Sequence, residues 1–87
     1  MQYKCEICGM YVKPEYRENG IAQKLIERLV EYAKEKGCTQ VHLTCTTINT
    51  AGVNLYQKCG FAIYGTEPNA IKINGKFYDE YLMVRKI

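Results

Sequence analysis

The spacing of apolar residues changes several times along the chain, and each change marks an element. Residues 4–12 (KCEICGMYV) are rich in apolar residues and stop before Pro14, which is typical of a strand. From residue 21 to 36 the apolar positions recur at the spacing of a helix, polar residues such as Glu27 fill the opposite face, and Gly37 follows as a C-cap glycine. The apolar positions of this helix are Ile21, Leu25, Ile26, Leu29, Val30, Tyr32 and Ala33. The pattern predicts an amphipathic helix that packs through this apolar face.

The second half of the chain continues with a strand, a short helix and a hairpin. Residues 40–46 (QVHLTCT) alternate between apolar and polar, as a strand does. Residues 49–60 (NTAGVNLYQKCG) indicate a helix that Asn49 or Thr50 can cap and Gly60 ends. A further strand begins at Phe61, and the Asn-Gly pair at residues 74–75 predicts a hairpin between two β-prone runs. The order β-α-β-α-β-β predicts one α/β (α+β) domain over residues 1–87, with a long helix packed on a mixed sheet.

Composition and charge narrow the class of protein. The chain has 87 residues, 47% of them hydrophobic and 24% charged, as in an ordinary soluble globular domain. Twelve Lys and Arg against nine Asp and Glu give a net charge of +3, with the basic residues scattered. There is no apolar run of the roughly 20 residues that span a membrane, and no signal-peptide pattern. We therefore expect a cytoplasmic protein that binds neither nucleic acid nor membrane and whose mild positive charge favours a small anionic ligand.

Five cysteines raise the question of metal or redox chemistry. An odd number of cysteines without a secretion signal favours reduced thiols over a disulfide framework. Cys5 and Cys8 form a CxxC, but no second pair accompanies it and the only histidine, His42, is isolated, so we expect no metal site. Cys38, Cys45 and Cys59 are interpreted as small buried apolar residues.

The junction before the long helix, PEYRENGIAQKL, is rich in permissive and polar residues. The first turn of a helix exposes backbone N–H groups at the positive end of its dipole, which favours an anion. Gly20 gives clearance, Ala22 adds little bulk, Asn19 tolerates unusual dihedral angles, and Arg17 can contact phosphate oxygens. These residues fit a diphosphate lying across the amides of residues 17–22. For the junction alone, an ordinary loop-to-helix turn explains the same residues at least as well.

Two motifs in order give the junction a context. The string from Val12 to Ala22, with Arg17, Gly20 and Ala22 at its key positions, resembles motif A (R/Q-x-x-G-x-G/A) of the GNAT superfamily of acyl-CoA N-acyltransferases. Residues 49–61 are similar to its motif B (N-x-x-A-x-x-L-Y-x-K-x-G-F), with Gly52 in place of the usual alanine. Residues 65–87 also resemble the final hairpin of many bacterial members. The two motifs, together with the predicted elements that join them, cover nearly the whole chain.

The resemblance implies a function and a set of site residues. It implies transfer of an acetyl group from acetyl-CoA to a primary amine, with the Tyr56 hydroxyl protonating the departing CoA thiolate. Asn49 would contact the pantetheine or shape the acceptor end, and Lys24 would lie near the phosphates. The other implied cofactor-binding residues are Met10, Tyr11 and Val12 beside the pantetheine arm, and Arg17, Glu18, Asn19, Gly20, Ile21 and Ala22 around the diphosphate. A backbone N–H near Val12 would polarise the thioester carbonyl. Glu6 could act as a base, although a solvated strand charge is the simpler interpretation.

The resemblance begins in the middle of the family's fold. We therefore expect a truncated domain that lacks the N-terminal half, which in the family supplies much of the acceptor pocket, and whose first strand is a bare sheet edge. A homodimer is the favoured way to complete it; a separate polypeptide with the other half, or a remnant that folds only marginally, are the alternatives. Two functions stay open: an N-acetyltransferase, or a non-catalytic acyl-CoA-binding module.

Overall fold

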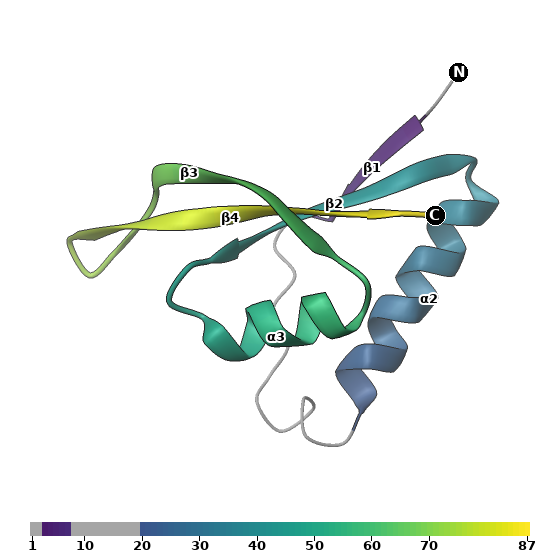
Figure 1. Ribbon diagram of the computed structural model, residues 1–87, viewed down its shortest axis with the longest axis horizontal. Helices are drawn as coiled ribbons and strands as arrows, with labels where there is room; N and C mark the ends of the chain where they lie inside the picture. Colours follow the sequence, from purple (N-terminus) through teal and green to yellow (C-terminus); the bar gives the residue numbers. More distant parts are fainter. Residues whose placement is uncertain (1–2, 8–19) are drawn as a thin grey trace.

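The computed structural model describes residues 3–7 and 20–87, with side chains from residue 20 onward. The elements are β1 (Tyr3–Ile7), α2 (Ile21–Glu35), β2 (Cys38–Thr46), α3 (Thr50–Lys58), β3 (Ala62–Ile73) and β4 (Lys76–Lys86) (Figure 1). The predicted order β-α-β-α-β-β is confirmed. The first predicted strand is confirmed over β1, and its remaining residues, 8–12, lie outside the described residues.

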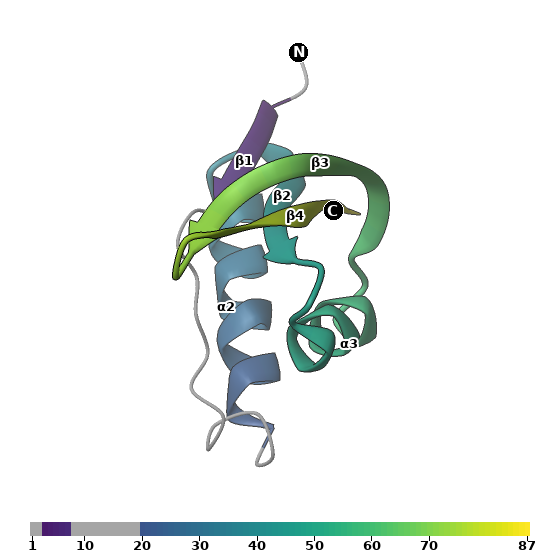
Figure 2. The ribbon, with the colours of Figure 1, turned by 90° about the vertical axis from the view of Figure 1, so that its left-hand side faces the viewer.

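The strands form one mixed sheet in the order β1-β2-β4-β3. β1 and β2 are parallel, and their described pairs run from Tyr3 with Cys38 to Ile7 with Leu43. α2 is the crossover between the two strands. β4 is antiparallel to both of its neighbours. Both helices lie on the same side of the sheet (Figure 2). The predicted mixed sheet with a long helix packed on it is confirmed.

The face through which α2 packs is narrower than the sequence predicts. Its buried residues are Ala22, Ile26, Val30 and Ala33, at intervals of four, four and three residues. The neighbouring row, Ile21, Leu25, Leu29 and Tyr32, was expected in the same buried face, but these side chains are between 39% and 59% exposed. The prediction was wrong for this row because a sheet contacts only the single stripe of a helix that faces it. An apolar row is left on the surface beside the buried stripe.

The core lies between the two helices and one face of the sheet. The largest fully buried side chains are Ile26 and Val30 of α2, Val41 of β2 and Met83 of β4. Along β2 the buried residues alternate, as the sequence pattern predicts: Val41, Leu43 and Cys45 face the helices. Tyr56, Cys59 and Phe61 extend this core under α3.

The cysteines whose side chains the structure describes differ in their surroundings. Cys45 and Cys59 are each 4% exposed and belong to the core, which confirms their interpretation as small buried apolar residues. Burial raises the pKa of the Cys59 thiol, and the nearby Glu27 carboxylate adds to that effect. Cys38, at the start of β2, is disulfide-bonded, so the prediction of a reduced thiol was wrong for this residue. That prediction rested on the cell compartment, whereas pairing depends on which parts of the chain the fold brings together.

The hairpin turn is the one that the sequence predicts. Asn74 and Gly75 have positive φ angles of 50° and 81°, as a type I′ turn requires at both central positions. β3 is longer than expected, because the strand beginning after Phe61 continues to Ile73. Its pairing with β4 is irregular between Ile63 and Gly65 and again between Glu67 and Ile71. These irregularities let a long strand twist over the core.

Arg85 of β4 connects three elements. One of its terminal nitrogens, Nη1, donates to Glu27 Oε1 on α2 and to the Cys59 carbonyl oxygen at the end of α3, both at 2.7 Å. Nη2 lies 3.4 Å from the second oxygen of Glu27, so the ion pair is bidentate. Glu27 was expected on the solvated face of the helix, but its carboxylate is used in this contact. The hydrogen bond from Arg85 lowers the pKa of Glu27 below its ordinary value of 4.5.

The lowered pKa makes the Arg85 contact sensitive to pH. A carboxylate with a lower pKa in the folded state stabilises the fold above its unfolded pKa and loses that contribution as the pH falls through the folded value. Glu27→Gln keeps the shape but removes the charge, so we expect the variant to be less stable than the wild type near pH 7. The difference should shrink as the pH falls below about 4.5. Denaturant unfolding near pH 7 and below about pH 4.5 measures the free energy of unfolding of the wild type and the variant. Glu31→Gln, on the same helix, is the control. A difference that is independent of pH would contradict the prediction.

Candidate functional site

The first turn of α2 is shaped to leave its backbone open. Gly20 stands at the N-cap with φ 71°, in the left-handed region that favours glycine, and no atom lies within 4 Å of where a Cβ would stand. Among residues 20–87 no side chain caps the helix, and its first turn carries no acidic residue. The N–H groups at this end therefore face outward at the positive end of the helix dipole with no side-chain acceptor from the cap.

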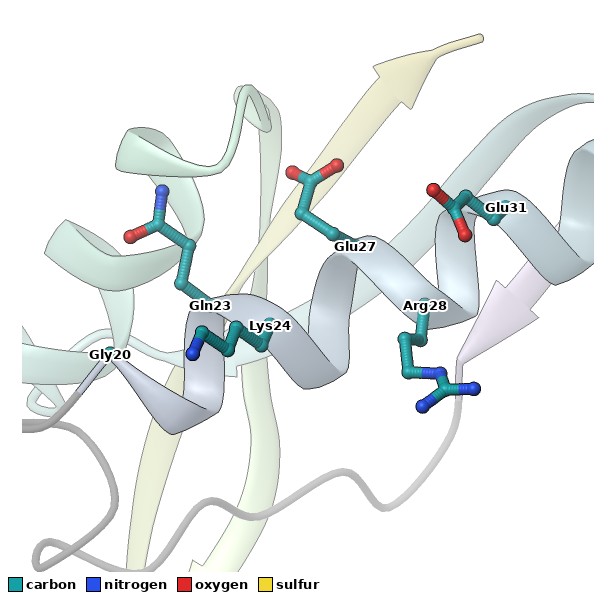
Figure 3. Close-up of a pocket in the computed structure, with 6 residues that line it drawn as sticks. All are labelled: Gly20, Gln23, Lys24, Glu27, Arg28 and Glu31. Carbon is teal, nitrogen blue, oxygen red and sulfur yellow. The ribbon is translucent and has the colours of Figure 1, made fainter.

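A groove of about 690 Å³ runs from this turn along α2. Its described lining residues are Gly20, Gln23, Lys24, Glu27, Arg28 and Glu31 (Figure 3). In Figure 3, Gln23 and Glu27 project to one side of the helix, and Lys24 and Arg28 project to the other. The Glu27 carboxylate is already paired with Arg85. Among the charged side chains that the structure describes, that of Lys24 lies nearest in sequence to the turn. The turn is suited to an anion.

The structure brings four of the predicted cofactor-binding residues together at the start of α2. Gly20, Ile21 and Ala22 contribute their backbone, and Lys24 contributes an exposed side chain. The side chain of Ala22 is fully buried, so its small size serves packing against the sheet and not clearance for a ligand. The predicted residues Met10, Tyr11, Val12, Arg17, Glu18 and Asn19 lie outside the described residues, and their roles stay predictions.

Four of the residues that line the groove were not identified from the motifs. Gln23, Arg28 and Glu31 line it although motif A does not include them, and the fourth such residue is Glu27. Residues four apart lie on one face of a helix, so the rows 20-24-28 and 23-27-31 could have been found from spacing once the turn was taken as the site. The motif match alone does not extend beyond the first turn.

Asn49 caps α3, as one of the two sequence alternatives predicts. Its side-chain oxygen accepts a hydrogen bond from the Gly52 N–H at 3.0 Å. A Cβ at position 52 would stand 2.9 Å from Asn49 Cγ and closer still to its amide nitrogen, so the glycine in place of the motif's usual alanine makes room for this conformation of Asn49. The side-chain oxygen of Asn49 is used in this cap. The contact of Asn49 with pantetheine stays a prediction.

Tyr56, the predicted proton donor, is part of the core. It lies on α3, is 5% exposed, and meets Phe61 edge to face with ring centroids 6.2 Å apart. The backbone carbonyl of Tyr56 accepts hydrogen bonds from the N–H groups of Cys59 and Phe61, which close the end of α3. This packing fixes the ring, as a proton donor of defined position requires, and equally suits a structural tyrosine.

Residues 3–7 and 20–87 contain neither a candidate metal-binding cluster nor a helix that could span a membrane. No group of three or more His, Cys, Asp or Glu side chains in this part of the chain could hold a metal ion. In the same residues, no helix is long and apolar enough to cross a membrane.

The sequence matches that of a known family over most of its length. The Acetyltransferase (GNAT) family matches residues 1–61, which include the open turn, β2 and α3. The chain belongs to this family.

Individual relatives resemble different parts of the chain. The thialysine N-epsilon-acetyltransferase of Sus scrofa is 45% identical over 51 residues, which are 59% of this chain and 30% of that protein. Among solved structures, Arabidopsis thaliana NAA60 in complex with acetyl-CoA is 31% identical with a TM-score of 0.86, over 94% of this chain and 47% of that one. A GNAT-family acetyltransferase from Streptococcus pneumoniae is 38% identical with a TM-score of 0.80, over 88% and 47%. The chain therefore spans less than a third of the curated relative and about half of the solved ones.

Proposed function

We propose that this protein is an N-acetyltransferase that transfers the acetyl group of acetyl-CoA to a primary amine. The open first turn of α2 is the observation that carries the proposal: among the described residues no atom lies within 4 Å of a Cβ placed at Gly20, and the turn itself carries no acidic residue. Membership of the GNAT family supports the reaction class, and a similar solved structure is a complex with acetyl-CoA. The similar proteins named as N-acetyltransferases support an amine as the acceptor.

In this proposal the two ends of acetyl-CoA bind to different elements. The diphosphate accepts hydrogen bonds from the backbone N–H groups at the start of α2, with Lys24 supplying a positive charge. The pantetheine arm follows the chain beyond β1, and Asn49 at the start of α3 lies near its thiol end. The amine attacks the thioester carbonyl, and Tyr56 donates a proton to the sulfur as the carbon–sulfur bond breaks.

The charge of Lys24 tests the diphosphate site. Lys24→Glu should weaken acetyl-CoA binding by about tenfold or more, because it replaces an attraction with a repulsion worth roughly 1 kcal/mol each in water. Calorimetric titration with acetyl-CoA measures the affinity. Lys34→Glu, an exposed change at the far end of the same helix, is the matched control and should bind like the wild type. Equal affinities of both variants, or no binding by the wild type, would contradict the site.

The hydroxyl of Tyr56 tests the catalytic step. Tyr56→Phe should lower the turnover of acetyl-CoA with thialysine by about 10²–10⁴-fold, the usual contribution of a general acid, and leave acetyl-CoA affinity unchanged. Release of the CoA thiol gives the rate. Tyr81→Phe, at a tyrosine packed against the same core, controls for loss of packing. Unchanged turnover in Tyr56→Phe would exclude its role as the acid, whereas wild-type binding without turnover would favour the acyl-CoA-binding module.

We also propose that two copies of the chain associate. β1 stands at the edge of the described sheet, where backbone groups are available for pairing, and α2 carries the exposed row Ile21, Leu25, Leu29 and Tyr32. Light scattering at micromolar concentration should give twice the chain mass of 10.0 kDa. Leu25→Lys should shift the mass toward the monomer, while Lys34→Glu should not. A stable wild-type monomer would overturn the proposal.

A further inference from the structure

The face of the sheet opposite the helices carries a polar network. Along β2, Gln40, His42 and Thr44 alternate with the core residues and therefore point away from α2 and α3. Both helices cover the other face (Figure 2). His42, the only histidine in the chain, is linked there to side chains of β2 and β3.

Both ring nitrogens of His42 have defined partners. Nε2 lies 2.9 Å from Gln40 Oε1, and Nδ1 lies 3.2 Å from the Tyr64 hydroxyl. An amide oxygen only accepts, so Nε2 carries the hydrogen in the neutral imidazole, and Nδ1 accepts from the Tyr64 O–H. The two rings meet edge to face with centroids 5.5 Å apart. The network therefore presents a basic nitrogen to a phenol whose ring is 54% exposed.

Tyr64, which contacts His42, lies at an irregularity in the pairing of β3 with β4. β4 lies between their strands: His42 is opposite Val84, and Val84 is opposite Ala62. In the pairing of β3 with β4, Ile63 is opposite Met83 and Gly65 is opposite Leu82, so Tyr64 is the extra residue of an irregularity. Regular alternation from Ala62 already places Tyr64 on the face that carries His42, and the extra residue puts Gly65 on that face as well.

The position of this network suits the reaction proposed above, on which the inference rests. His42 pairs with Glu6 of β1, the strand that leads into the segment proposed to hold the pantetheine arm. Tyr56, the proposed donor to sulfur, is on the opposite side of the sheet, in the core beneath α3. We propose that the Tyr64–His42–Gln40 network accepts the proton that the attacking amine loses. Donor and acceptor would then act from opposite faces of the sheet.

The step balances as follows. The amine nitrogen bonds to the carbonyl carbon, and the carbon–sulfur electron pair leaves with sulfur, which takes a proton from Tyr56. The proton lost by nitrogen passes to the Tyr64 oxygen while the Tyr64 proton moves to Nδ1 of His42. The imidazolium so formed keeps its Nε2–H on Gln40 Oε1, which favours the charged ring. Tyr64 is the residue that touches the amine, and His42 holds the proton.

Charged residues occupy register positions beside the network. Glu6 of β1 is the strand partner of His42, Lys86 of β4 is opposite Gln40, and Glu80 is opposite Thr46. A histidine ionises between roughly pH 5 and 8, and only its neutral form accepts a proton. Turnover should therefore rise with pH through the ionisation of His42.

The pH profile of kcat/KM for acetyl transfer to thialysine separates this role from a structural one. His42→Gln should lose the rise on the acid side and fall by roughly 10²-fold or more in rate, and Tyr64→Phe should fall similarly. Both should bind acetyl-CoA with wild-type affinity. Tyr78→Phe, a half-buried tyrosine of β4 outside the network, is the matched control. If kcat/KM of His42→Gln still rises with pH as in the wild type, the proposed role of the network is wrong and the proposed function is unaffected. A wild type without turnover contradicts the proposed function as well.

A second measurement needs no turnover. Nitrogen NMR of the imidazole in the intact chain near pH 8 should show a neutral ring protonated at Nε2. Tyr64→Phe should shift the Nδ1 signal, because its hydrogen bond is lost. A ring protonated at Nδ1, or an Nδ1 signal unchanged in Tyr64→Phe, would overturn the relay whatever the kinetics.

Discussion

The packing of α2 against the sheet is the contact on which the rest of the structure depends. Ile26 and Val30 share one fully buried cluster with Val41 of β2 and Met83 of β4. Because α2 is also the crossover between β1 and β2, this contact fixes both the parallel pair and the place where the helix begins. The direction of the open N–H groups at Gly20 follows from it, since a helix seated by its buried stripe cannot rotate without exposing that stripe.

Arg85 adds a polar constraint to this apolar one. Its guanidinium holds α2 through Glu27 and the end of α3 through the Cys59 carbonyl, so the two helices keep their positions on one face of the sheet. The same contact neutralises a carboxylate in the groove that leads to the open turn. A fold contact and the charge balance of the candidate site therefore depend on one side chain.

Much of the fold could be predicted because its signals are local. The Asn-Gly pair specifies the hairpin, Gly37 and Gly60 follow the two helices with positive φ, and Asn49 caps α3. The errors concern contacts between distant residues. Leu25 and Leu29 match the helical period as well as Ile26 does, yet only Ile26 meets the sheet. The pairing of Glu27 with Arg85 and the contact of Tyr64 with His42 both join segments that are far apart in sequence.

The sequence by itself determined the element order, the two motifs and the glycine at the start of α2, because each depends on neighbours within a few residues. It placed Gly20, Ile21, Ala22 and Lys24 in one turn and Tyr56 on the helix of the second motif. Only the tertiary structure decided which side of α2 is buried, that Ala22 serves the core, and that His42 is not isolated. Those outcomes depend on strand register and on the side of the sheet that the helices cover, which no local pattern specifies.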